Sequence, residues 1–347
     1  MWNETILTKM LGTEYPIIQA PMAGGATAPV LVSAVSNAGG LGFFAGGYLS
    51  AQQISAGIQA VRSLTDRPFG VNLLLPEYPV PDIVQIDRAH RSMQGIRDEL
   101  DIDTVPAPAE YAPPFDDTME AVLEARPAVF SFTFGILEDR WMQRVKSAGT
   151  IVFGTATTVE EASALEKAGV DAVVVQGSEA GSHRATFLGR VEDSLVGTMS
   201  LVPQTVDAVR IPVIASGGIM DARGIRAALT LGATGVQMGT AFLAADECGI
   251  SAAYKEVLLA AGGDHTTLTR VFSGKVARGL RNRFIDEMRP FEQDLPPYPI
   301  QNALTQDIRK TAARLGRAEF LSLWAGQGVG QIQAKSAAAL IEEWVRE

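Results

Sequence analysis

Short apolar runs rich in valine, isoleucine and phenylalanine alternate along the chain with segments of helical periodicity. Eight runs are predicted as strands, at residues 16–22, 41–47, 69–75, 128–134, 150–156, 171–177, 211–218 and 235–243. Continuous apolar runs are typical of parallel strands covered on both faces, and strands that alternate with helices indicate βαβ units. Eight such units favour an α/β fold closed as a TIM (β/α)8 barrel over an open doubly wound sheet.

Two stretches interrupt this alternation and indicate a domain division. Residues 76–127 are rich in proline and are predicted as an insertion after the third strand, with one helix near 82–100. We expect residues 1–249 to form the barrel, 250–299 a smaller cap domain, and 300–347 C-terminal helices that pack back on the barrel. The cap would hold a helix near 252–261 and a string rich in glycine and arginine, FSGKVARGLRNRF.

Composition narrows the classes of function. The 39 acidic against 29 basic residues give the 347-residue chain a net charge of −10, which disfavours nucleic acid and anionic membranes as partners. The single cysteine, Cys248, excludes an internal disulfide and a cysteine-built metal site. With no leader-like segment in residues 1–16 and no apolar run of membrane length, we expect a cytoplasmic protein. The mean hydropathy of +0.13 allows a homo-oligomer without requiring one.

Glycine turns follow the last two predicted strands. Ser216-Gly217-Gly218 ends the seventh run, and Gly239-Thr240 interrupts the eighth. Barrel enzymes commonly bind phosphate at the loops after these two strands, through backbone N–H groups and a helix N-terminus. One glycine pair alone is more often a tight turn, but both turns on adjacent strands favour phosphate binding.

Histidines and buried amides are the remaining candidates for chemistry. His183 follows the sixth strand on a loop that we expect to be flexible, at the catalytic rim of a barrel, where an imidazole can take or give a proton at physiological pH. His90 is predicted to be a solvated surface residue and His265 to lie in a turn. Asn72 and Gln176 interrupt apolar runs, so each makes either a structural hydrogen bond or a ligand contact. We find no HExxH, CxxC or histidine–carboxylate pattern of a metal site.

Several strings occur together in an order that is specific. They are QAPMAGG at 19–25, GVNLLLP at 70–76, VVVQGSEAGSHRATF at 173–187, IPVIASGGI at 211–219, VQMGTAFL at 236–243, FSGKVARGLRNRF at 272–284 and WAGQG at 324–328. Together the strings resemble the nitronate monooxygenase family, formerly grouped as 2-nitropropane dioxygenases, over nearly the whole chain except the insertion. The family usually has two glycines before the histidine, whereas the second is Ser182 here.

The resemblance implies an FMN enzyme with particular site residues. The FMN phosphate would be held at the glycine turns by Gly217, Gly218, Gly239 and Thr240, and Ser216 would be a further cofactor-binding residue. The residues around the flavin ring would be Ala20, Pro21, Met22, Asn72, Gln176, Gly181 and Gln327. His183 would be the catalytic residue, and no metal is implied. Lys275 and Arg278 would be either part of the cap structure or anion-steering groups.

The implied reaction is oxidation of a small anionic alkyl nitronate, such as propionate 3-nitronate, by O2. It would pass through a flavin semiquinone and a nitronate radical and give a carbonyl compound and nitrite. His183 would position the nitro group and balance its charge, or take the α-proton of a neutral nitroalkane as general base.

Three rival functions remain open. The closest is a related flavin barrel, an NADH-using enoyl-acyl carrier protein reductase, and another is an NADH:quinone reductase. The ARGLRNRF and WAGQG strings favour the monooxygenase over the enoyl-acyl carrier protein reductase. The rival of a different class is a flavin-binding protein without turnover.

Overall fold

Eight parallel strands form the central sheet in a computed structural model that describes residues 2–103 and 110–346. They are β1 (Ile17–Gln19), β2 (Gly42–Ala45), β3 (Phe69–Leu74), β4 (Val129–Thr133), β5 (Ile151–Ala156), β6 (Ala172–Gln176), β8 (Val213–Ser216) and β9 (Gly235–Met238). The strand order is β1-β9-β8-β6-β5-β4-β3-β2. Leu41 joins the two edges, because its O accepts from Gln19 N at 3.0 Å and its N donates to Ile17 O at 2.9 Å. The predicted (β/α)8 barrel is confirmed.

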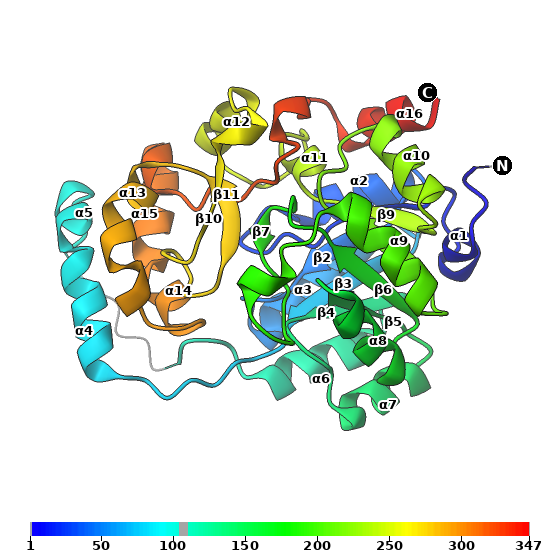
Figure 1. The fold of residues 1–347 in the computed structure, drawn as a ribbon, viewed down its shortest axis with the longest axis horizontal. Helices are drawn as coiled ribbons and strands as arrows, with labels where there is room; N and C mark the ends of the chain where they lie inside the picture. The colour runs from blue at the N-terminus through cyan, green and yellow to red at the C-terminus, as the bar shows by residue number, and fades with distance from the viewer. Residues whose placement is uncertain (1, 104–109, 347) are drawn as a thin grey trace.

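Helices cover the outside of this barrel (Figure 1). Those that follow the strands are α2 (Pro29–Asn37), α3 (Ala51–Arg62), α6 (Phe115–Ala125), α7 (Asp139–Ser147), α8 (Val159–Lys167), α9 (Thr198–Ala208), α10 (Ala222–Thr230) and α11 (Thr240–Leu243). The short α11 does not complete the wall. That place is taken by the C-terminal helix α16 (Ala337–Arg346), which packs against α2 and α10.

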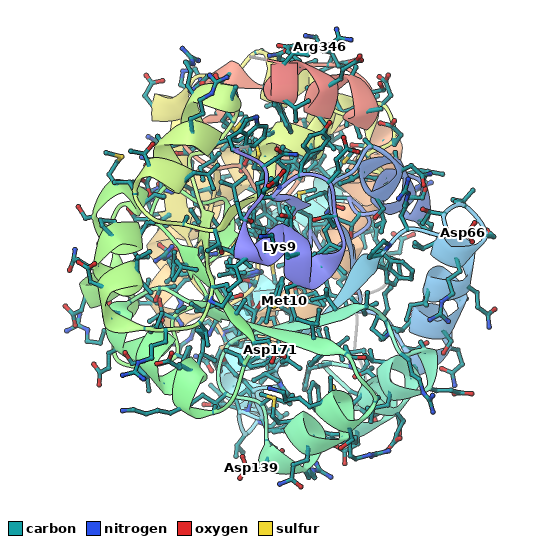
Figure 2. The ribbon with its side chains drawn as sticks, turned by 90° about the vertical axis from the view of Figure 1, so that its right-hand side faces the viewer. Lys9, Met10, Asp66, Asp139, Asp171 and Arg346 are labelled. Atoms are coloured by element: carbon teal, nitrogen blue, oxygen red, sulfur yellow. The ribbon has the colours of Figure 1, made fainter. Side chains whose placement is uncertain are left out.

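One end of the barrel is closed by α1 (Ile6–Leu11), a helix that the sequence pattern did not predict. Its Leu7 and Leu11 pack against inward-facing strand residues at the amino ends of the strands: Ile18, Phe43, Val129, Phe153, Val174 and Ile214. Figure 2 views this end, with Lys9 and Met10 of α1 in front of the sheet. The half of the barrel interior at the amino ends of the strands, its lower half, is therefore an apolar core.

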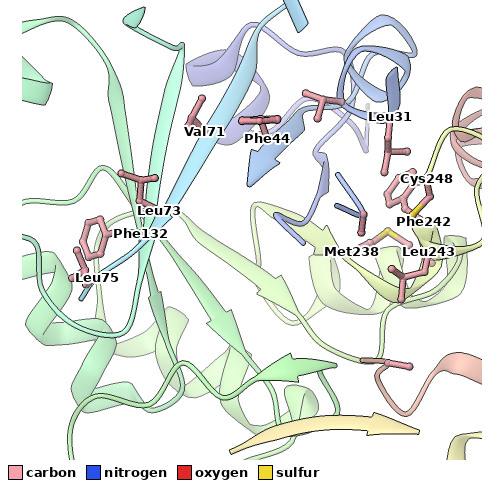
Figure 3. Packing of buried hydrophobic residues seen from close by; sticks show 14 of the residues in the cluster. Leu31, Phe44, Val71, Leu73, Leu75, Phe132, Met238, Phe242, Leu243 and Cys248 are labelled. Atoms are coloured by element: carbon pink, nitrogen blue, oxygen red, sulfur yellow. The ribbon is translucent and has the colours of Figure 1, made fainter. Parts of the chain in front are cut away.

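The larger apolar core lies between the strands and the outer helices. Phe44, Leu73 and Phe132 contribute to it from the strands and Leu31 from α2 (Figure 3), and each is at most 6% exposed. Because one set of side chains fills the barrel and the alternate set packs under the helices, both faces of each strand are buried. This arrangement explains why the strands are continuous apolar runs.

The first part of the insertion after β3 and the segment between α11 and α16 form a smaller lobe, at the left and top in Figure 1. Its helices are α4 (Ile83–Ser92), α5 (Gln94–Glu99), α12 (Ala252–Leu259), α13 (Arg283–Met288), α14 (Ile300–Leu304) and α15 (Gln306–Leu315). The two segments are joined by Arg97 Nε and Asp307 Oδ2, which lie 2.8 Å apart. Short 3-10 helices are η1 (Val191–Ser194), η2 (Gly263–His265), η3 (Arg289–Asp294), η4 (Ala318–Phe320) and η5 (Val329–Gln331). The predicted domain boundaries stay predictions.

A second, three-stranded antiparallel sheet stands above the barrel. It has the order β10 (Thr266–Thr269), β11 (Ala277–Leu280), β7 (Ser182–His183), with Ala277 paired to His183. The sequence pattern predicts neither β10 nor β11. The expectation that His183 lies on a flexible loop is wrong, because the residue is in a paired strand and only 9% exposed.

Three further expectations need correction. The eighth run is not one strand, since Gly239 ends β9 and residues 240–243 are helical. The insertion contains α4 and α5 in place of one helix, and residues 115–125 at its end are the barrel helix α6; its residues 104–109 lie outside the described residues. His90 is half-buried rather than solvated, and burial lowers its pKa.

Candidate active site

A cavity of about 820 Å³ lies at the carboxyl ends of the barrel strands. Its polar floor includes Asn72, Ser131, Thr155 and Gln237, above the apolar lower half of the barrel. The cavity brings together nearly all of the predicted site residues: Ala20, Pro21, Met22, Asn72, Gln176, Gly181, His183, Ser216, Gly217, Gly218, Gly239 and Thr240. The carboxyl ends of parallel strands are where barrel enzymes carry their chemistry.

One end of the cavity is made of glycine turns. Gly217 and Gly218 have φ values of +113° and +73°, which an L side chain rarely adopts. Within the described ranges, the backbone N–H groups of Gly218, Gly239 and Thr240 donate to no protein acceptor. Thr240 Oγ1 accepts from Gly326 N at 2.9 Å, so its own proton is available to a ligand. These donors fit a phosphate group.

Gln327 is the predicted site residue that the cavity does not include. Its side chain is exposed, and its backbone N donates to Glu179 O at 2.9 Å. The neighbouring Gly326 and Gly328 do line the cavity. The WAGQG string therefore contributes through its glycine backbone and through Trp324.

Another part of the cavity wall holds His183, which is surrounded by aromatic rings. The ring centroids of Phe134, Tyr298 and Trp324 lie 5.9, 6.0 and 5.5 Å from the imidazole. These residues come from segments far apart in the chain, and none of them is among the site residues expected from the sequence. An imidazole among aromatic rings is poorly hydrated.

The hydrogen bonds of Ser273 fix the tautomer of His183. Ser273 Oγ donates its single proton to Lys275 O at 3.0 Å. At the 2.8 Å contact with His183 Nε2, the serine oxygen must then accept, so Nε2 carries the proton. Nδ1 is left as the unprotonated nitrogen, with no hydrogen-bond partner in the part of the chain that the structure describes.

Burial, assisted by the positive charges of Lys275 and Arg309, lowers the pKa of His183 to about 3. Desolvation disfavours the imidazolium, and the two cations repel it. The side chain is therefore neutral at physiological pH. A neutral imidazole can accept a proton at Nδ1, but it cannot balance the charge of an anion.

The strand end that precedes His183 is held by a buried arginine. Arg184 Nη1 donates to Gln176 Oε1 at 3.0 Å and to Gly177 O at 2.8 Å, and Gln176 Nε2 donates to His183 O at 2.9 Å. Burial lowers the pKa of Arg184 to about 10, well above physiological pH. Gln176 thus makes structural hydrogen bonds while it lines the cavity. Asn72 does the same through Nδ2, which donates to Ser131 Oγ at 2.8 Å.

Ser182 has a φ of +65°, in the left-handed region. A non-glycine residue there costs about 1 kcal/mol or more relative to glycine. The family's usual glycine at this position therefore has a conformational explanation, and this chain carries the strain directly beside His183.

Lys275 and Arg278 are both engaged by protein groups. Lys275 Nζ pairs with Glu77 Oε1 at 2.6 Å and lies 4.5 Å from the Phe134 ring centroid. Arg278 Nε donates to Ser178 O at 3.0 Å. These contacts favour a role in cap structure over anion steering.

Barrels of this architecture with a deep cavity at the carboxyl ends of the strands are typical of enzymes that act on small molecules, and the chain is an α/β-barrel enzyme of this class. A family model described as nitronate monooxygenase matches residues 4–347. A probable nitronate monooxygenase of Staphylococcus aureus (strain Newman) is 47% identical over 328 residues, which cover 94% of this chain and 92% of the relative. The chain belongs to the nitronate monooxygenase family, a family of oxidoreductases, and the predicted resemblance is confirmed.

Two solved structures extend the comparison. A nitroalkane oxidase from Streptomyces ansochromogenes is 40% identical with a TM-score of 0.91, covering 98% of this chain and 97% of that one. FabK from Thermotoga maritima is 31% identical with a TM-score of 0.78, covering 99% and 95%. No helix among the described residues combines the length and apolarity needed to span a bilayer. In the same ranges, no cluster of His, Cys, Asp and Glu side chains is suited to a metal ion.

Proposed function

We propose that the protein catalyses the FMN-dependent oxidation of alkyl nitronates by O2 to a carbonyl compound and nitrite. Family membership and the likeness to a nitroalkane oxidase support the substrate class. The observation that carries the mechanism is His183, a neutral imidazole with an open Nδ1 in the same cavity as a set of unpaired backbone N–H donors.

The donor set fits FMN. Gly218, Gly239 and Thr240 would hold its phosphate through backbone N–H groups and the Thr240 hydroxyl, while Asn72 and Gln176, which line the same cavity, would contact its ring system. When bound, FMN supplies the electron-transfer chemistry, and the protein supplies orientation and electrostatics.

The chain's own residues then act on the substrate. The aromatic side chains around His183 exclude water and orient the reacting carbon. With a neutral nitroalkane, His183 Nδ1 accepts the α-proton, and the hydrogen bond from Nε2 to Ser273 Oγ holds the ring in the correct tautomer. With a nitronate no proton has to be removed, so His183 positions the substrate.

The test is oxygen uptake by the purified protein, loaded with FMN, on addition of propionate 3-nitronate, with NADH alone as the control. Rapid uptake with the nitronate and none with NADH is the expected result. Bleaching of the flavin by NADH without a response to the nitronate would favour a reductase. The likeness to FabK is the reason for testing this competing function. No response to either compound would indicate a binding protein.

A further inference from the structure

Arg309 is a cation in the wall of the cavity whose hydrogen bonds all go to uncharged acceptors. Its Nη2 donates to Asn302 O at 2.7 Å and to Asn302 Oδ1 at 3.0 Å, and its Nε donates to Thr305 O at 3.3 Å. Nη1 has no hydrogen-bond partner within residues 2–103 and 110–346. The hydrogen bonds of Nε and Nη2 therefore fix the guanidinium in position, and Nη1 is left available to a ligand.

The other charges near this part of the cavity are compensated. Lys275 pairs with Glu77, and Asp307, which neighbours Arg309 in α15, pairs with Arg97 at 2.8 Å. Lys310 also lines the cavity, but its side chain is exposed to solvent and hydrated. Arg309 is half-buried, and no carboxylate forms an ion pair with it among the described residues.

The positive charge of Arg309 shifts the pKa of two side chains that line the cavity, His183 and Tyr48. Its positive charge is one of the causes that lower the pKa of His183, after burial and Lys275, and it opposes the burial that raises the pKa of Tyr48 to about 12. The same field that disfavours an imidazolium favours an anion bound beside it. Since His183 is neutral, the charge that balances a bound nitronate has to come from another residue.

Building on the proposed function, we propose that Arg309 binds the anionic NO2 group of the nitronate and makes the site prefer the nitronate over the parent nitroalkane. The planar guanidinium matches a planar group with two oxygens, as it matches a carboxylate. A nitronate and its nitroalkane have the same carbon skeleton and the same two oxygens, but only the nitronate carries a full negative charge. The preference would therefore be electrostatic and would depend on Arg309.

The test compares Arg309→Gln, Arg309→Lys and a control, Arg314→Gln, which removes an exposed charge from the same helix. KM and kcat are measured for propyl-1-nitronate and for 1-nitropropane. Arg309→Gln should raise KM for the nitronate roughly 10- to 100-fold, the effect of losing a charge-assisted hydrogen bond, and change KM for the nitroalkane less than about threefold. Arg309→Lys should recover part of the loss, and Arg314→Gln should match the wild type.

A second measurement needs no turnover. Sodium nitrite, a planar anion with two oxygens, is titrated calorimetrically into the flavin-loaded wild type and each variant. Arg309→Gln should bind nitrite most weakly, Arg309→Lys should be intermediate, and Arg314→Gln should match the wild type. If that variant does not fold, Arg309→Lys carries both measurements, because loss of the planar fork should still weaken both anions severalfold.

Equal KM changes for the two substrates, or unchanged nitronate KM and nitrite affinity in the folded variants, would overturn the assignment of Arg309. Failure of the proposed function would look different, because the wild type would then not turn over either substrate. The nitrite titration would in that case still decide whether Arg309 is an anion-binding residue.

Discussion

The two ends of the cavity are built by different means. At the end that we propose to bind the FMN phosphate, the donors are backbone N–H groups. They lie in two turns, around Gly218 and Gly239, that follow consecutive strands of the barrel. At the catalytic end, side chains converge from distant segments, such as Phe134 after β4 and Trp324 near the end of the chain. Backbone recognition depends on local conformation, whereas the catalytic end depends on long-range packing.

The comparison predicts that a change at the catalytic end affects chemistry and not cofactor binding. His183→Asn should retain FMN and lower kcat for a neutral nitroalkane by roughly 10²- to 10⁴-fold, the usual effect of losing a general base. The loss with a pre-ionised nitronate should be smaller, since no proton is removed. Steady-state kinetics with both substrates and FMN titration measure these effects; equal losses on both substrates would contradict the role as base.

Burial of His183 also predicts a pH dependence of stability. Because the folded pKa is about 3 and the unfolded value is about 6.5, the unfolded state binds the extra proton between these pH values. Stability is fully retained above about pH 6.5 and is lost as the pH falls toward 3, by up to about 1.4 kcal/mol per pH unit from this group.

Denaturant unfolding of the wild type and of His183→Gln from pH 7.5 to 4 isolates this contribution, because glutamine can keep a donor toward Ser273 but does not titrate. The wild type should lose more stability than the variant over that range. Parallel curves would mean that His183 is not buried as a neutral group.

A change at the proposed phosphate site should affect cofactor affinity first. Gly217→Ala introduces a side chain at φ +113°, where its Cβ would lie 3.1 Å from Thr198 Oγ1 and 3.2 Å from Ala180 N. We expect FMN affinity to fall about tenfold or more, with activity largely restored at saturating FMN, since distortion costing about 1.4 kcal/mol is a factor of ten. Fluorescence titration of FMN measures this effect.

Gly169→Ala is the matched control for strain alone. Gly169 also has a positive φ, +89°, but its Cβ would meet no atom within 4 Å, and the residue lies outside the cavity. This variant should lose fold stability while FMN affinity stays at the wild-type value. A loss of FMN affinity in both variants would indicate general destabilisation rather than a phosphate site.

The smallest effect concerns Ser182, which joins β7 to the loop after β6. Ser182→Gly should raise the unfolding free energy by less than about 1 kcal/mol, because glycine removes left-handed strain but gains freedom in the unfolded chain. Arg126→Gly, at the left-handed C-cap of α6, is the matched control outside the cavity. A loss of stability confined to Ser182→Gly would show that the serine hydroxyl makes a contribution of its own.

The barrel was predictable because its strands are encoded locally. Each of the eight apolar runs contains one observed strand, since burial on both faces leaves a continuous apolar signal. Strand β11 has no such signal: it reads Ala-Arg-Gly-Leu, and its partners Ser182 and His183 are far away in the chain. Helix α1 was missed because six residues are too few to show helical periodicity.

The site residues also divide into those that the local sequence indicates and those that only the folded structure brings to the site. Gly218 and Thr240 could be selected from turn chemistry and strand position, and His183 from its place after the sixth strand. Ser273, which fixes the histidine tautomer, looks like an ordinary loop serine in the sequence. Arg309 belongs to a helix whose other arginine and lysine residues are exposed, so only its place in the cavity wall of the folded structure distinguishes it.

The position of α16 has a consequence for how this architecture can vary. Since α16 completes the barrel wall, the segment between α11 and α16 is topologically a cassette with both ends on the barrel. Such a cassette could be exchanged between homologues without breaking the barrel wall, as a means of changing substrate range. Every replacement would have to supply a strand that pairs with Ser182 and His183, because β11 holds the histidine in its place.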